Sequence, residues 1–321
     1  MGRVYAAAIG AVILLAGAPA TAADKAIIVH AGKADSASHA LALQFAEALA
    51  EGNNALTIQV EESQGSVQNI IDTRSRGADY VFTASPSLIA QAKRGDKPFQ
   101  RDKRYRNIRA LFPLPPLTMH WVVRADAEIK DFADLAGQPF VPGAKGSFGE
   151  RQTASMLHAL GIEQRAELID IDAAGAQAAF AGKQVAGLAL AGPFPLPSVL
   201  DLAKTTPVRV LSLSPQELAK VLAADDSLVA QIIPKGTYPA LDRDVTSIAL
   251  PAGAYTTTQM SDATAYAIVK AFWSQKGALS RRDPPWDSVT PGSLPLLGVK
   301  LHKGALRYYR EAGIKVPAAL R

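Results

Sequence analysis

Apolar and polar positions alternate along the chain in blocks that predict strands followed by helices. Short apolar runs at residues 26–29, 57–60 and 80–83 have the length of buried strands. The first two runs are each followed by a Gly- or Ser-containing loop and then by apolar residues at helical spacing. Repeated strand–loop–helix units are typical of a parallel sheet with helices on its faces. We therefore expect an α/β fold.

A second set of blocks follows the proline-rich residues 113–116. Since proline can continue neither a helix nor a central strand, we expect a connection here that leads into a strand and a second lobe. A later strand returns the chain, so residues from about 255 onward should pack on the first lobe. The predicted fold is two-lobed, with a mostly parallel sheet in each lobe and crossing strands between them. The predicted elements of the second half are strands at 119–123, 139–141, 168–171, 185–190 and 245–250, and helices at 131–136, 147–160 and 173–181.

The N-terminus has the pattern of an export signal. Arg3 is its only charge, residues 6–18 form an apolar run, and Ala20 and Ala22 are small residues that suit a signal peptidase. We expect cleavage after Ala22 or one residue later and a periplasmic product; the alternative is a retained anchor. No later run approaches the ~20 apolar residues of a membrane helix. The predicted segments are a signal peptide (1–22), the first lobe (23–118), the second lobe with hinge strands (119–245) and the return to the first lobe (246–321).

The composition and the motifs of the chain argue against several kinds of chemistry. The chain has no Cys, so disulfides and thiol chemistry are excluded, and its five His residues lack the spacing of a zinc helix. The catalytic motifs G-x-S-x-G, H-E-x-x-H and G-x-x-x-x-G-K-[ST] do not occur. Ser147, His158 and Asp172 could be assembled into a triad, but His158 lies within a predicted helix and nothing orients it. We expect no metal, no cofactor and no enzymatic activity.

The formal net charge is +5, and basic residues gather between residues 94 and 109. Such a cluster can mark a nucleic-acid footprint. It can equally be a solvated connection between two elements, and an exported chain meets little nucleic acid. We expect no nucleic-acid partner.

Five segments carry a resemblance to one family, in the family's order and over almost the whole chain. Residues 302–314 are similar to the ending H-P-G-A-x-R-Y-Y-x-E-x-G-I, and residues 233–239 to I-P-x-G-x-Y-P. Residues 62–69 are similar to T-G-G-S-x-x-N, residues 129–137 to I-K-x-x-x-D-L-x-G, and residues 146–147 stand where the family has G-S-G-T. The chain thus resembles the TAXI-type solute receptors of TRAP transporters.

The resemblance implies a type 2 periplasmic-binding fold and a receptor that works without chemistry. Family ligands are small acids such as glutamate or other carboxylates, and the partner is a TRAP-type membrane permease. We expect a monomer. A receptor that feeds a signalling protein, and a receptor of another transporter class, remain open as alternatives.

The candidate ligand site lies in loops that join strands to helices. Ligands of open α/β sheets bind beyond the carboxyl ends of the strands, where backbone N–H groups and the helix dipole attract an anion. Gly permits close backbone approach and a Ser hydroxyl can donate to a carboxylate. The expected ligand-binding residues are Gly32, Lys33, Ala34, Asp35, Ser36, Gly65, Ser66, Val67, Ser85, Gly146, Ser147, Phe148, Gly192 and Pro193.

Two of these residues have an alternative interpretation in which they do not contact a ligand. Ser147 lies three residues before Glu150, which is the pattern of a helix cap that needs no ligand. Lys33 can pair with a carboxylate or be solvated. The first loop also lacks the family's Gly-rich, Tyr-containing run, and Phe148 replaces a small residue. These departures favour a ligand other than glutamate and a pocket that is less polar or more closed than the family's usual one.

Overall fold

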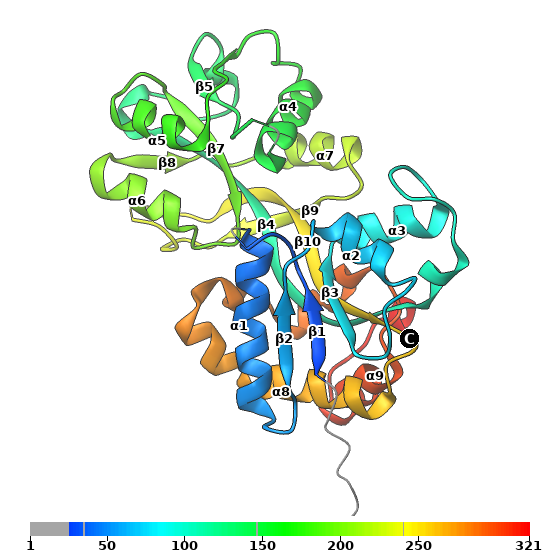
Figure 1. Ribbon diagram of the computed structural model, residues 1–321. Coiled ribbons are helices and arrows are strands. Elements are labelled where there is room, and N and C mark those ends of the chain that lie inside the picture. The colour runs from blue at the N-terminus through cyan, green and yellow to red at the C-terminus, as the bar shows by residue number, and fades with distance from the viewer. Residues whose placement is uncertain (1–25, 35, 146, 240) are drawn as a thin grey trace, which may run out of the picture.

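The computed structural model describes residues 26–34, 36–145, 147–239 and 241–321. The predicted signal peptide lies outside these residues. Figure 1 shows two groups of elements: one holds the first strands and helices together with the C-terminal helices, and the other holds the middle of the chain. The strands β4 and β10 run between them. The α/β class and the two-lobed architecture expected from the sequence are confirmed.

Helices and strands alternate through most of the described chain. The strands are β1 (Ile27–His30), β2 (Ile58–Glu61), β3 (Tyr80–Ala84), β4 (Ile108–Arg124), β5 (Pro139–Val141), β6 (Glu167–Leu168), β7 (Gly187–Gly192), β8 (Val208–Val210), β9 (Val229–Ile233) and β10 (Val245–Thr257). The α-helices are α1 (Ala37–Gly52), α2 (Ser66–Asp72), α3 (Pro86–Arg94), α4 (Phe148–Leu160), α5 (Ala173–Ala181), α6 (Pro197–Thr205), α7 (Pro215–Ala224), α8 (Asp262–Arg282) and α9 (Lys303–Glu311).

The strands form one mixed sheet that passes through both lobes. Its order is β2-β1-β3-β10-β4-β7-β5-β6, with β8 added to β4 and β9 added to β10. The pairs at the two outer ends are parallel: β1 with β2 and β3, and β5 with β6 and β7. The pairs made by β4 and β10 are antiparallel. The long central strands therefore join the two lobes.

The expectation that the proline-rich stretch cannot continue a central strand is wrong. The strand β4 begins at Ile108 and continues through Pro115 and Pro116. Its pairing with β10 shifts register between Leu250 and Ala252, so that two prolines stand opposite one residue. A bulge of this kind leaves residues outside the ladder, where a missing N–H costs no hydrogen bond. The prolines therefore mark an irregularity inside a crossing strand.

Three clusters of buried apolar side chains follow the two lobes. The first draws on residues 27–114 and 254–320, and Phe112 stacks on Phe272 there with ring centroids 4.0 Å apart. The other two draw on residues between 119 and 248. They lie on opposite faces of the sheet, because Trp121 belongs to one and its neighbour Val122 to the other. These clusters support residues 119–245 as the proposed second lobe.

A glycine sets how closely the last two helices approach. A Cβ atom added at Gly304 would lie 2.1 Å from the carbonyl oxygen of Asp262 and 2.7 Å from the amide nitrogen of Tyr266. Gly304→Ala should therefore push α9 from α8 and lower the free energy of unfolding by about 1–3 kcal/mol, measured by urea unfolding. Gly277→Ala, an exposed site in α8 with nothing nearer than 3.7 Å, is the control and should be neutral or stabilising.

Candidate functional site

A cavity of about 290 Å³ lies where the two lobes meet. Its walls come from the first turns of three helices of the first lobe, from both crossing strands and from the segment after β7 in the second lobe. The lining residues are Ala37, Ser38, Leu41, Ser66, Thr83, Ala84, Ser85, Leu88, Leu114, Pro115, Leu117, Pro193, Leu250, Pro251 and Ala252. We call this space the cleft cavity.

The three helices differ in how their N-termini are capped. Ser36 caps α1 by accepting the N–H of His39 at 3.2 Å, and Ser85 caps α3 by accepting the N–H of Leu88 at 3.4 Å. The N-cap of α2 is Gly65, with φ at 102° and no side-chain cap. Helix N-termini carry unpaired N–H groups and a partial positive charge. The start of α2 at Ser66 is therefore the one of these three helix starts without a side-chain cap.

A buried asparagine holds α2 against the strand ends. The side-chain amide of Asn69 donates to the carbonyl oxygens of His30 at 3.3 Å, Ala31 at 3.1 Å and Thr83 at 3.1 Å. Its backbone carbonyl accepts the hydroxyl of Tyr80 at 3.0 Å. The sequence motif of residues 62–69 therefore has two parts: Gly65-Ser66 opens the helix at the cavity, and Asn69 positions it. Asn69 is a positioning residue that the expected site did not include.

A second cavity of about 230 Å³ lies on the other side of Leu117, at the start of α4. Leu117 lines both cavities, so they meet at β4. Ser147 caps α4 by accepting the N–H of Glu150 at 3.1 Å, as the helix-cap interpretation of this residue predicted. Ser147 and Phe148 line this second cavity together with β7 and Gln177 of α5.

The structure brings some of the expected ligand-binding residues together. Ser66, Ser85 and Pro193 line the cleft cavity, and Ser147 and Phe148 line the second one. Asp35 and Gly146 lie outside the described residues. The remaining expected residues line neither cavity: Gly32, Lys33, Ala34, Ser36, Gly65, Val67 and Gly192.

The apolar walls are the residues that sequence reasoning missed. Leu41 and Leu88 come from the first and third helices, while Leu114, Leu117 and Leu250 come from the crossing strands. In the sequence these leucines look like ordinary core positions. The proline at 115 was the one available signal, because it marks where β4 bends out of its ladder beside the cavity.

The electrostatics of both cavities depend on backbone and hydroxyl groups. Neither described lining contains a Lys, Arg, Asp or Glu. Among the described residues, no group of three or more His, Asp or Glu side chains is placed to hold a metal ion. Nor does any helix in the described ranges combine the length and apolar character needed to cross a bilayer. Among the described lining residues, only N–H and O–H groups are present as donors to an anion.

A buried hydrogen-bond chain ties the crossing strand to the segment after β7. The Nδ1 atom of His120 lies 3.1 Å from the carbonyl oxygen of Thr118, so it carries the proton of the neutral imidazole. The hydroxyl of Tyr238 then donates to Nε2 of His120 at 2.8 Å and accepts the N–H of Leu196 at 2.8 Å. Burial lowers the pKa of His120 to about 4 and raises the pKa of Tyr238. The chain ends three residues from Pro193, which lines the cleft cavity.

Comparisons with known proteins find a matching family model and similar solved structures. The model of the NMT1-like family matches residues 37–313. A TctC solute-binding protein from Polaromonas is 15% identical, with 81% of this chain and 85% of that chain covered and a TM-score of 0.51. The periplasmic binding protein BugD is 13% identical, with 90% and 97% covered and a TM-score of 0.48. MatC from Rhodopseudomonas palustris, with bound malate, is 13% identical, with 85% and 88% covered and a TM-score of 0.44.

Proposed function

This chain belongs to the NMT1-like family and has the fold of periplasmic solute-binding proteins, which bind and do not catalyse, and from this premise we propose that it is an exported receptor for a small organic acid. The acid binds between the lobes, and the receptor delivers it to a membrane permease of the TRAP type. The resemblance of residues 302–314 and 233–239 to TAXI-type receptors supports that choice of transporter.

One observation carries the proposal: three helix starts from the first lobe converge on a cavity that Pro193 of the second lobe helps to close. Each helix N-terminus attracts an anion by about 0.3–1 kcal/mol, and by up to about 2 kcal/mol when partly buried. Ser38 and Ser66 both line this cavity. Such a wall can replace the water around a carboxylate without a basic side chain.

The apolar walls of the cleft cavity indicate which organic acids it can bind. Leu41, Leu88, Leu114, Leu117 and Leu250 surround the polar wall with apolar surface. Among the described lining residues, no carboxylate is present to hold an ammonium group and no cation to hold a second carboxylate. Burying either charge without a partner costs several kcal/mol. We expect a monocarboxylate with an apolar body to bind better than an amino acid or a dicarboxylate.

A thermal-shift and calorimetry panel tests this function. The panel pairs branched and straight-chain monocarboxylates with their neutral amides, glutamate and malate. A ligand that binds the folded state alone stabilises it by RT ln(1 + [L]/Kd), about 2.7 kcal/mol at a hundredfold excess over Kd. We expect the acids to raise Tm and the amides to have little effect. Equal increases in Tm with the amides would contradict the hypothesis that the solute binds as an anion.

Location and delivery need separate measurements. N-terminal sequencing of periplasmic material should begin near residue 23, and an intact Met1 in the membrane fraction would contradict export. Deleting the gene should abolish uptake of the acid that the panel identifies. If uptake persists without the receptor, the proposed role in transport is wrong, while the proposed binding of the acid is unaffected.

Ser66→Ala should weaken binding of that acid by about tenfold or more. A hydrogen bond to a charged group contributes about 1.5–3 kcal/mol, and Ser66 does not cap its own helix, so Tm without ligand should hardly change. Calorimetry and unfolding of the same variant separate the two effects. Ser85→Ala is the matched variant: its hydroxyl caps α3, so it should lose about 1 kcal/mol of stability. If Ser66→Ala binds the acid with unchanged affinity, this hydroxyl does not contact the ligand.

A further inference from the structure

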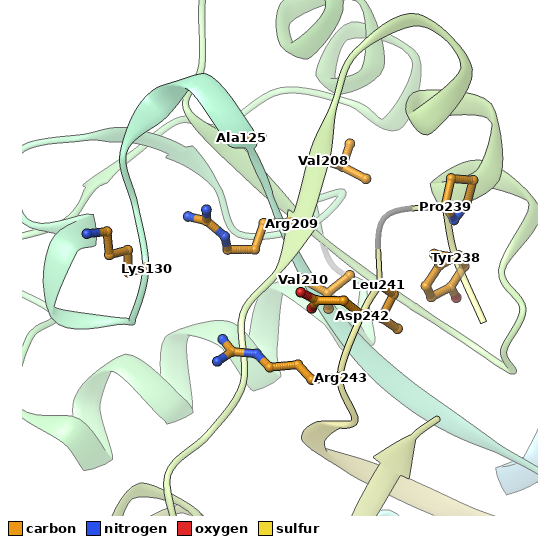
Figure 2. A pocket seen from close by; sticks show the side chains of 10 residues that line it. All are labelled: Ala125, Lys130, Val208, Arg209, Val210, Tyr238, Pro239, Leu241, Asp242 and Arg243. Carbon is orange, nitrogen blue, oxygen red and sulfur yellow. The ribbon is translucent and has the colours of Figure 1, made fainter. Parts of the chain in front are cut away.

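The largest of the described cavities lies outside the cleft. It has a volume of about 470 Å³ and lies beside β8, the turn after β4 and the segment after Tyr238 (Figure 2). Its described lining residues are Ala125, Lys130, Val208, Arg209, Val210, Tyr238, Pro239, Leu241, Asp242 and Arg243. We call it the β8-edge groove. The proposed solute site does not use it.

The groove follows a strand edge that no described strand occupies. Among the described strands, β8 pairs with β4 alone. Pro207 accepts the N–H of Ala125 at 2.9 Å, and Leu211 donates its N–H to Trp121 at 2.8 Å, so these residues bond toward β4. Backbone groups alternate in direction along a strand, and those of Val208 and Val210 therefore point to the other edge. No described strand pairs with that edge, which lies along the groove.

The described lining of the groove carries more basic than acidic side chains. Lys130, Arg209 and Arg243 line it with one carboxylate, that of Asp242, and in Figure 2 the three basic side chains extend to the same side of β8. Many surface cations elsewhere are paired with carboxylates, as in Arg104 with Asp102. Within the described residues, none of the three groove cations has an ion pair. A positive field of this kind attracts a negatively charged partner.

The position of the guanidinium of Arg209 is set by the protein. One of its Nη atoms donates to the carbonyl oxygen of Ile129, which holds the side chain and leaves other N–H groups free. The floor of the groove is apolar, formed by Val208, Val210 and the buried ring of Tyr238. An elongated groove with an apolar floor and a basic rim fits an extended peptide that alternates apolar and acidic residues.

We propose that the β8-edge groove binds an extended acidic segment of a partner protein. The segment lies in the groove along β8, and its carboxylates lie against Lys130, Arg209 and Arg243. A flat anionic bilayer cannot enter a concave groove, and a small inorganic anion would fill little of it. The site is independent of the cleft, so the proposal does not depend on which solute the cleft takes.

Binding is measured by fluorescence anisotropy with the full mature chain and a short labelled peptide of alternating glutamate and valine. A peptide of alternating glutamine and valine controls for charge. The test variant is Lys130→Glu with Arg243→Glu, both at exposed positions outside the proposed solute site. The matched control is Lys315→Glu, an exposed lysine of the first lobe. We expect the double variant and the glutamine peptide each to weaken binding by about tenfold, and the control to leave it unchanged.

Several results would overturn the proposal. These are no measurable binding of the acidic peptide, equal binding by the double variant, and equal loss in Lys315→Glu. Citrate that displaces the peptide at concentrations similar to its own would show a small-anion site instead. The wild type could also bind phosphatidylglycerol vesicles more tightly than the peptide, with no vesicle binding by the double variant. That result would show that the groove binds a membrane surface. Circular dichroism and Tm of each variant confirm that the fold is retained in every comparison.

Discussion

Replacing Asn69 by Ala is expected to remove about 3–5 kcal/mol of the free energy of unfolding. Asn69 is fully buried, and its amide serves the carbonyl oxygens of His30, Ala31 and Thr83 at the ends of β1 and β3. Alanine removes the donor that these three acceptors share, and each unmade hydrogen bond in the interior costs about 1–3 kcal/mol. The carbonyl oxygen of Ala31 keeps the hydroxyls of Thr83 and Ser38 as donors. Urea unfolding at neutral pH measures the loss.

Two further variants separate the hydrogen bonds from packing. Asn69→Asp keeps the shape but turns oxygen atoms toward the same carbonyl oxygens, so it should lose at least as much stability as the alanine variant. Asn54→Ala, at an exposed asparagine of the first lobe, should stay within about 0.5 kcal/mol of the wild type. A loss below about 1 kcal/mol in Asn69→Ala would mean that α2 is held by other contacts.

Acidification is expected to remove about 3 kcal/mol through His120 alone. Burial lowers the pKa of its imidazole from 6.5 to about 4 in the folded chain. Because the folded pKa lies below the unfolded one, the unfolded chain takes up the proton first as the pH falls. The contribution to stability is complete above pH 6.5 and is lost progressively between pH 6.5 and about 4. Protonation of Nε2 also removes the acceptor that Tyr238 uses.

The difference between wild type and His120→Gln isolates this effect from that of the carboxylates. Glutamine cannot titrate, and its side-chain oxygen can accept the Tyr238 hydroxyl, so its stability should fall less steeply between pH 6.5 and about 4. His158→Gln, at an exposed histidine of α4, controls for loss of a histidine as such. Parallel pH profiles for wild type and His120→Gln would show that His120 does not titrate in this range.

The first lobe was largely predictable because its signals are local. The predicted runs at 26–29, 57–60 and 80–83 lie within one residue of β1, β2 and β3 at each end. Each is a short apolar run, and the loop after it begins a helix at a Ser or Gly. The same reasoning found Ser66 and Ser85 at the polar wall of the cleft cavity. Whether they contact a ligand stays a prediction.

The second lobe was predicted less completely because its elements are short. A strand of three residues such as β8 has too few positions to show alternation, and α6 and α7 follow runs that could equally be loops. The general rule that proline excludes a strand failed at Pro115, because a bulge opposite β10 makes the missing N–H harmless. No local pattern contains the partner strand that permits this.

The sequence by itself determined the α/β class, the order of the strand–loop–helix units and the helix starts that face the cleft, since hydrophobic periodicity and capping act over a few residues. Only the tertiary structure decided which side chains meet. The antiparallel pairing of β4 with β10 places Leu117 and Leu250 in one wall, and it brings Tyr238 to His120 across 118 residues of chain. Such contacts depend on which distant strands pair and in which register, and the free energy that selects that pairing belongs to the whole buried core.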